Sequence, residues 1–226
     1  TRIDKIGDKL SLLNASGKGA NTVRYYDGAD PDDIWAVRSA GIDPSNGKEL
    51  FYAKDGSYTY DFSYDDEVIC GNTRPDVEGV IGSSLNWKGF SVSLNFRYQM
   101  GADVFNEALY NKVENISRND LNKNQDKRAL YERWQEVGDI VHFKDIASAE
   151  TTPMSSRFVQ EENVLTLESI YVGYEFYDGW IKKLGLSSLK IQASMRDVFR
   201  ASTIRSERGI AYPFARSMEA GLSFNF

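Results

Sequence analysis

The stretch Phe90–Tyr98 reads F-S-V-S-L-N-F-R-Y and alternates apolar and polar side chains without interruption. Successive side chains of a β-strand point to opposite faces, so a period of two over this length predicts a strand. One face of that strand is apolar and the other is polar. The polar face carries Ser91, Ser93, Asn95 and Arg97.

A second alternating segment, Val77–Trp87, precedes this strand across the two-residue link Lys88-Gly89. Such links are typical of β-hairpins, because glycine adopts a positive φ without strain. In the resulting register both strands place their apolar residues on the same side, as a sheet with one apolar face requires. The predicted register pairs Trp87 with Phe90, Leu85 with Val92 and Ile81 with Phe96.

Alternation elsewhere in the chain predicts more strands of the same kind. Residues 189–195 and 214–226 alternate, and residues 164–176 alternate with a change of parity near Glu168 and Ser169. A β-bulge at that point would keep one apolar face along the whole strand. Shorter candidates lie at residues 34–42, 48–53 and 58–65, with a stub of a further strand before Ile6.

The connections between these segments are of two kinds. Lys88-Gly89, residues 43–47 and residues 178–187 are short, whereas residues 99–162 show no strand alternation. Outer-membrane β-barrels alternate short periplasmic turns with long extracellular loops, so counting back from a periplasmic C-terminus places all three short connections in the periplasm. The predicted fold is all-β, with antiparallel transmembrane β-barrel strands and a long, partly helical extracellular loop at 99–162. The helix-like segments in this loop are residues 103–113 and 126–135.

The composition excludes several functional classes. A net charge of −6 offers no basic face for nucleic acid. The single cysteine, Cys70, and the single histidine, His142, exclude an internal disulfide and a zinc site built on cysteines or a histidine pair. Neither residue has the neighbours of an activated nucleophile, and the sequence shows no other catalytic motif, so we predict that the protein is not an enzyme.

Six short stretches occur in an order and spacing that resemble one known family. They are Ala40–Gly47, Gly71–Pro75, Leu85–Phe90, Gly101–Asn106, Ser155–Val159 and Leu167–Phe176, followed by Tyr212-Pro213 and a strand that ends at Phe226. The pattern resembles the SusC/RagA-like TonB-dependent outer-membrane transporters of the Bacteroidetes over nearly the whole chain. The resemblance is to the last third of their barrel.

The resemblance implies the C-terminal portion of a 22-stranded barrel in the cell outer membrane. Members of the family enclose a plug domain, carry a SusD-like surface lipoprotein as a lid, and import glycans or peptides with energy from the TonB complex. The plug, which contacts TonB, would precede Thr1, so residues 1–226 are expected to be part of a longer chain. Outer-membrane lipid and the barrel-assembly machinery are the other implied partners.

Under this interpretation the polar face of residues 90–98 lines the barrel. An apolar outer face leaves polar groups inward, so Ser91, Ser93, Asn95 and Arg97 would face a wet lumen or touch the plug. In a soluble sandwich these side chains would face solvent instead. Phe226 is the candidate barrel-assembly signal, with an ordinary edge-strand phenylalanine as the alternative.

The long loop contains candidates for contact with the substrate or the lid. Aromatic rings and guanidinium groups stack on sugars or bind peptides, although the same residue types also pack loops internally. The loop candidates are Tyr110, Tyr131, Trp134 and Arg157. Near the predicted turns, Trp87, Phe90, Tyr177 and Trp180 are expected to form an aromatic girdle at the membrane interface.

An acidic cluster is the one candidate for a bound ion. Asp27, Asp30, Asp32 and Asp33 offer the oxygen ligands that calcium prefers. Their spacing departs from that of an EF-hand loop, and a solvated acidic loop is the alternative. No other cofactor is expected.

Two other functions are compatible with the strand pattern. A soluble, secreted β-sandwich that binds carbohydrate would also alternate and be rich in aromatic residues. A small stand-alone outer-membrane barrel could close with about eight strands. These alternatives differ in where the apolar face points, because a sandwich buries it in a protein core and a barrel turns it toward lipid.

Overall fold

The computed structural model describes residues 8–120, 122–148, 150–205 and 216–226, and the chain divides into two compact units. The strand unit comprises residues 75–101 and 162–226, and the loop unit comprises residues 1–74 and 102–161. Three features predicted from sequence lie outside the described residues. They are the stub before Ile6, the Tyr212-Pro213 pair and residues 214–215 of the last predicted strand.

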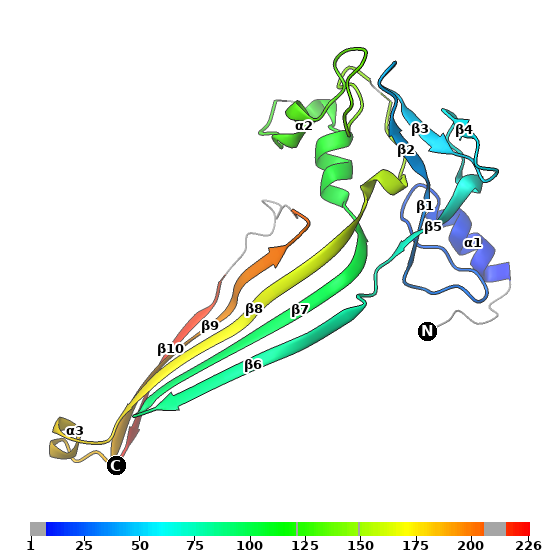
Figure 1. The fold of residues 1–226 in the computed structure, drawn as a ribbon. Helices are drawn as coiled ribbons and strands as arrows, with labels where there is room; N and C mark the ends of the chain where they lie inside the picture. The colour runs from blue at the N-terminus through cyan, green and yellow to red at the C-terminus, as the bar shows by residue number, and fades with distance from the viewer. Residues whose placement is uncertain (1–7, 121, 149, 206–215) are drawn as a thin grey trace. The chain divides into compact units, whose positions relative to one another are not determined.

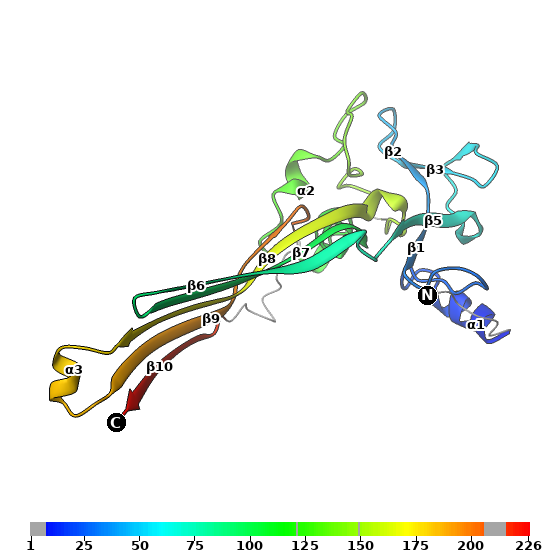
Figure 2. The ribbon, with the colours of Figure 1, turned by 60° about the horizontal axis from the view of Figure 1, so that its bottom comes forward.

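Five long strands form one sheet in the order β10-β9-β8-β7-β6 (Figures 1 and 2). The pairs β6–β7, β8–β9 and β9–β10 are antiparallel. The all-β, antiparallel fold predicted from the alternation is therefore confirmed. The strands are β6 (Val77–Trp87), β7 (Phe90–Phe105), β8 (Val159–Phe176), β9 (Ser188–Ser202) and β10 (Met218–Asn225).

The β6–β7 hairpin has the predicted register. Trp87 pairs with Phe90, Leu85 with Val92 and Ile81 with Phe96. The link residues Lys88 and Gly89 both have positive φ, 47° and 85°. Positive φ at both central residues is the geometry of a type I′ turn, whose twist matches that of the two strands.

Replacing Gly89 with alanine is expected to weaken this end of the sheet. A Cβ at Gly89 would lie 2.4 Å from the Glu175 carbonyl oxygen, at a φ of +85° that already disfavours alanine. We expect a cost of at least about 1 kcal/mol, read as faster hydrogen exchange of the amides around the turn. Gly56→Ala is the control, because Gly56 has the same φ and open space around it. Equal exchange effects in the two variants would contradict a role for the clash.

A β-bulge in β8 lies where the parity change predicts it. The β8–β9 register shifts between Leu167 and Ser169. Two successive residues of β8 then bond to the polar face of β7: Glu168 accepts from Arg97 at 2.5 Å, and Ser169 accepts from Asn95 at 2.9 Å. Because adjacent residues of a regular strand would face opposite ways, these bonds show that the bulge turns both side chains to one side.

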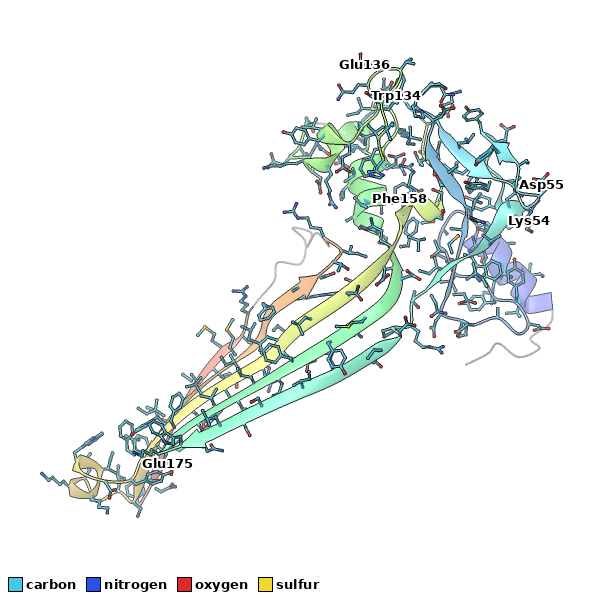
Figure 3. All side chains as sticks on the ribbon, viewed as in Figure 1. Lys54, Asp55, Trp134, Glu136, Phe158 and Glu175 are labelled. Carbon is cyan, nitrogen blue, oxygen red and sulfur yellow. The ribbon has the colours of Figure 1, made fainter. Side chains whose placement is uncertain are left out.

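Beyond the bulge the apolar face continues across β8, β9 and β10. The cross-strand rows are Val172–Ala193–Ala220, Tyr174–Ile191–Leu222 and Phe176–Leu189–Phe224. Several of these large residues are open to the surroundings, with Leu222 62% exposed and Phe224 54% exposed. Side chains project from both faces of the sheet (Figure 3), and in the strand unit one of the faces is an uncovered apolar surface.

The long connection is shorter than residues 99–162. Strand β7 continues to Phe105 and β8 begins at Val159, so residues 106–158 connect them. The helix predicted at 103–113 is wrong at its start, because Phe105 ends the strand and packs its ring on Phe158. The helical parts are a single π-helical turn at Leu109–Glu114, a 3-10 turn at Arg118–Asp120, the short helix α2 (Arg128–Tyr131) and a 3-10 turn at Ser156–Phe158.

The loop unit contains two small sheets in place of further barrel strands. In one sheet β1 pairs with β5, and in the other β2, β3 and β4 are neighbours. The strands predicted at 34–42, 48–53 and 58–65 are thus wrong as barrel strands, since each is too short to span the hydrocarbon core. The elements are α1 (Asp8–Gly17), β1 (Asp33–Val37), β2 (Ser39–Ile42), β3 (Glu49–Tyr52), β4 (Tyr58–Thr59), a 3-10 turn at Tyr64–Asp66 and β5 (Glu67–Asn72).

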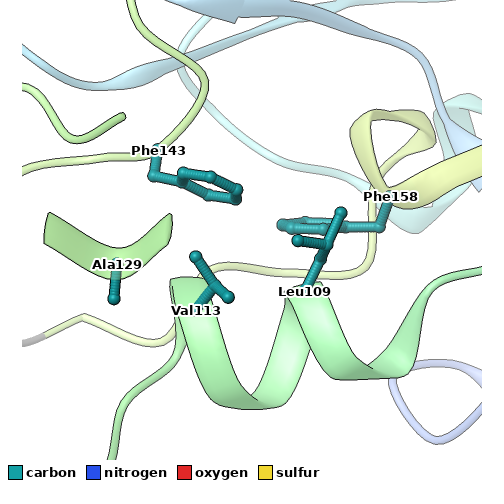
Figure 4. Packing of buried hydrophobic residues seen from close by; sticks show 5 residues of the cluster. All are labelled: Leu109, Val113, Ala129, Phe143 and Phe158. Carbon is teal, nitrogen blue, oxygen red and sulfur yellow. The ribbon is translucent and has the colours of Figure 1, made fainter. Parts of the chain in front are cut away.

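The long connection has a hydrophobic core of its own. Leu109 and Val113 on the π-helical turn pack with Ala129, Phe143 and Phe158, all of which are buried (Figure 4). The rings of Phe105 and Tyr110 pack against this cluster. Residues 106–158 are therefore a folded substructure, which explains how a connection of this length keeps a defined shape. No helix within the described ranges is long and apolar enough to cross a membrane.

The turn at residues 43–47 packs differently from what the prediction of three equivalent periplasmic turns implies. The amide of Gly138 and the indole of Trp134 both donate to the Pro44 carbonyl, at 2.8 and 3.1 Å. The turn at residues 43–47 thus packs against the long connection. By contrast, the Lys88-Gly89 turn bonds to the end of β8, where Glu175 donates to the Gly89 carbonyl at 2.8 Å.

Candidate functional site

The polar face of the strand unit carries the four predicted lumen residues. Ser91, Ser93 and Asn95 are half-buried, and Arg97 is exposed. Asn95 and Arg97 bond across to β8, and the polar face continues there with Tyr171, whose hydroxyl donates to Gln192 at 3.1 Å. The result is a strip of amide, hydroxyl and charged groups. Such a strip can bind water or a polar ligand, and its role toward lumen or plug stays a prediction.

The loop unit contains a buried ion cluster around Arg157. Its guanidinium lies 2.8 Å from Glu49 and 2.6 Å from Glu114, and the side chains are 9%, 6% and 0% exposed. Burial acts to lower the pKa of Arg157, but the two carboxylates outweigh it and raise that pKa above its ordinary value. Arg157 also lies over the Phe158 ring, 4.6 Å from its centroid.

Neighbouring groups add hydrogen bonds to this cluster, whereas the Nε of Arg157 is buried without a hydrogen-bond partner. Ser155 donates to Glu49 at 2.5 Å, and Thr152 donates to Glu114 at 2.8 Å. The buried Arg133 donates to three carbonyls, those of Ala129, Lys144 and Glu114. Buried charges are stable only when paired and bonded in this way, so the cluster ties the β3 hairpin to both ends of the long connection.

The four loop candidates do not form one site. Tyr110 is half-buried against Phe105 and Phe158, and its pKa is raised by burial. Trp134 is half-buried over the 43–47 turn, and Arg157 belongs to the ion cluster. Tyr131, at 79% exposure, is the one of the four that is open to a partner.

Tyr131 belongs to a segment, residues 130–140, that exposes four large apolar side chains; we call Leu130, Tyr131, Val137 and Ile140 the apolar tip. Their exposed fractions run from 61% at Leu130 to 91% at Ile140. The segment is held in place, because Asp139 accepts from the amides of Gln135 and Glu136 at 2.9 and 3.0 Å, and the Trp134 amide donates to the Phe143 carbonyl. Large apolar residues on a fixed segment are typical of protein interfaces. Trp134 and Glu136, which belong to the same segment, are labelled in Figure 3.

A groove of about 750 Å³ also lies in the loop unit, beside the ion cluster. Its lining combines aromatic rings with charges of both signs, which suits a polar ligand with one apolar face. Sequence reasoning did not single out these residues, since they come from segments far apart in the chain. Among them are Lys48, Glu49, Tyr60, Phe62, Lys144 and Thr152.

The acidic cluster is occupied by an arginine. Arg74 lies 3.0 Å from Asp30 and 2.8 Å from Asp32. A bond from the Asp32 amide, with Arg74 nearby, lowers the pKa of Asp30. Across the residues that the structure describes, no group of three or more histidine, cysteine or acidic side chains has metal-holding geometry. Calcium binding here stays a prediction, and a calcium ion would compete with Arg74.

The expected girdle residues gather at the turn end of the sheet. Trp87 pairs with Phe90, and Tyr177 lies beside Gly89. Trp180 packs its ring on Phe176 at 5.9 Å. Phe226 follows the last residue of β10 and is 91% exposed, and its role in barrel assembly stays a prediction.

No family model matches this chain. Among curated proteins it is similar to TonB-dependent receptor P39 of Formosa agariphila, with 25% identity over 171 residues, or 74% of this chain and 16% of the receptor. It is also similar to TonB-dependent receptor P3 of the same organism, with 24% identity over 169 residues, or 75% of this chain and 16% of the receptor. The chain thus spans about one sixth of the length of these relatives.

Solved structures of one transporter share the fold. The RagAB peptide importer in its open-open state matches with a TM-score of 0.70 and 20% identity, over 89% of this chain and 23% of the matched chain. A second structure of the RagAB peptide transporter matches with a TM-score of 0.64 and 20% identity, over 80% of this chain and 20% of the other. These matches and the two receptors confirm the resemblance drawn from the sequence.

Proposed function

We propose that this chain, which is related to SusC/RagA-like TonB-dependent outer-membrane transporters, supplies wall strands and outer loops to a nutrient importer in the cell outer membrane. The uncovered apolar face of the five-stranded sheet carries this proposal. A soluble protein rarely leaves such a surface open, whereas lipid covers it in a barrel. The named relatives are receptors and importers, which supports transport rather than catalysis.

In this proposal each face of the sheet has its own role. Leu94, Leu222 and the other apolar residues face lipid, and Ser91, Ser93, Asn95 and Arg97 face the lumen or a plug supplied by another part of the protein. Nutrient, a peptide or a glycan, passes along this polar face when the TonB complex moves the plug. The RagAB importer is named for peptides, which favours peptides as the first class to test here.

Growth experiments test the transport function. We would delete the gene in its source bacterium and compare growth on oligopeptides, on oligosaccharides and on free amino acids with simple sugars. Loss of growth on one oligomer class, restored by the intact gene, is the expected result. Unchanged growth and uptake on every oligomer would contradict an import function. Uptake assays with labelled oligomers then name the substrate class.

The apolar tip is proposed to contact a SusD-like lipoprotein lid. Fixed, exposed aromatic and aliphatic residues can bury themselves in a partner without ordering a loop first. The tip also carries the acids Glu132, Glu136 and Asp139, so a basic rim on the partner would complement it. The charge of the tip therefore adds selectivity to its apolar contact.

Replacing Tyr131 with alanine together with Ile140→Ser should weaken lid binding. Truncated hot spots cost about 2 kcal/mol or more, which is on the order of thirtyfold in affinity. The measurement is the amount of lipoprotein that co-purifies with the tagged transporter in mild detergent. Leu12→Ser is the matched control, because Leu12 is 73% exposed on α1 in the same unit. Undiminished co-purification with the double variant would rule out the tip as the docking surface.

A further inference from the structure

The connection between β8 and β9 is longer than a hairpin needs and folds on itself. It includes α3 (Trp180–Lys183), whose Ile181 is fully buried with Leu186 and Leu189. Phe176 at the end of β8 packs against the same cluster. Because Ile181 is anchored in this way, the orientation of α3 relative to the sheet is fixed.

Two exposed apolar residues flank the buried Ile181. Trp180 is 53% exposed, and Leu184, which follows the last residue of α3, is 63% exposed. Residues four apart in a helical turn lie near one another. The Trp180 ring contacts Phe176, and the Phe176 ring contacts Tyr174 at 4.6 Å. The outward face of α3 is therefore continuous with the apolar face of the sheet.

Lysines lie at the same place. Lys182 and Lys183 are both exposed on α3, and the Lys182 ammonium lies 2.8 Å from Asp178. At the neighbouring turn, Lys88 reaches over the Trp87 ring, 5.1 Å from its centroid. Lysine and tryptophan side chains gather where hydrocarbon meets charged headgroups, because each has an apolar body and a polar end.

We propose that α3 is an interfacial anchor that binds anionic phospholipid at the periplasmic surface of the outer membrane. Trp180 and Leu184 insert at the boundary between headgroups and acyl chains, and Lys182 and Lys183 contact the phosphates. The inference rests on the proposed function, since it needs the apolar sheet face to be in lipid. The argument for lipid as the occupant is that this sheet face leads directly onto α3 and that two lysines border the junction.

Spin labels in the full transporter test the anchor. Single cysteines replace Leu184, Leu222 or Asp178 in a cysteine-free background that includes Cys70→Ser. Each labelled protein is reconstituted in nanodiscs of phosphatidylethanolamine and phosphatidylglycerol. The collision rate of the spin label with oxygen is then compared with its collision rate with a water-soluble nickel chelate. Leu222 lies on the apolar sheet face, and Asp178 is an exposed residue of the same connection.

The three positions separate the outcomes. We expect labels at 184 and 222 to favour oxygen and the label at 178 to favour the nickel chelate. A label at 184 that behaves like 178, while 222 favours oxygen, overturns the anchor and leaves the proposed function intact. Access of the nickel chelate to the labels at both 184 and 222 would overturn the anchor and the proposed function together.

A charge-neutral variant tests the phosphate contact. Lys182→Gln with Lys183→Gln should move the 184 label toward the nickel chelate in nanodiscs that contain phosphatidylglycerol. In nanodiscs of phosphatidylcholine alone the same variant should shift it less. Equal label depth with and without the two lysines in phosphatidylglycerol would overturn the role of the lysines.

Discussion

Replacing Arg157 with methionine is expected to destabilise the loop unit by about 3–5 kcal/mol, because two carboxylates stay buried without their cation. Glu114 is 0% exposed and Glu49 is 6% exposed, so neither can recover water without local unfolding. The equilibrium constant for local opening of this unit should increase on the order of a hundredfold or more. Hydrogen exchange of the amides between residues 106 and 158 in the full transporter measures that opening.

Two control variants identify the cause of this loss. Arg74→Met removes an arginine that is 49% exposed and also bonds two carboxylates, and such surface pairs contribute about 0–1 kcal/mol. Combining Arg157→Met with Glu49→Gln and Glu114→Gln removes all three charges and should restore much of the protection, since neutral groups cost less to bury. If the triple variant exchanges as fast as the single one, lost packing and not unpaired charge explains the effect.

The long strands were predictable because one apolar face repeats over many residues. A shift of the β6–β7 register by one residue would turn Leu85 and Val92 to opposite faces, so only one pairing is compatible with the pattern. The same logic located the bulge at Glu168 from parity alone. In the loop unit, residues 34–42 begin with four consecutive apolar residues and specify no single register, and the chain leaves one sheet at Val37 and enters another at Ser39. Over so few residues, tertiary contacts decide the pairing.

The candidate site was only partly predictable. Alternation alone predicts the polar face, and Tyr131 is a loop candidate from sequence that the structure leaves exposed. The partners of Arg157 could not be found, because Glu49 is 108 residues away and the chain has 33 acidic residues among which no spacing marks a pair. Phe105, Leu109 and Val113 share a helical spacing, but this spacing cannot show that Phe105 still belongs to β7.

Replacing Leu94 with arginine should cost about 2–4 kcal/mol if this part of β7 lies near the bilayer midplane. Leu94 belongs to the apolar face and is opposite Ser83 on β6, well above the Lys88-Gly89 turn. The free energy of unfolding of the full transporter in phospholipid vesicles measures the loss. Ser93→Arg is the matched control, because the next residue faces the polar side and an arginine there can stay hydrated.

A second substitution at Leu94 separates lipid from a protein core, because arginine would also disrupt a sandwich. Fluid lipid accommodates a larger apolar side chain, so Leu94→Phe should change stability by well under about 1 kcal/mol in a barrel. In a packed core the same change would force neighbours to shift and cost about 1–3 kcal/mol. Asn95→Leu is a control on the polar face, since it loses the bond to Ser169 on β8 but leaves the lipid contacts of Leu94 unchanged. Tolerance of Leu94→Phe, with intolerance of Leu94→Arg, is the combination expected only when the apolar face meets lipid.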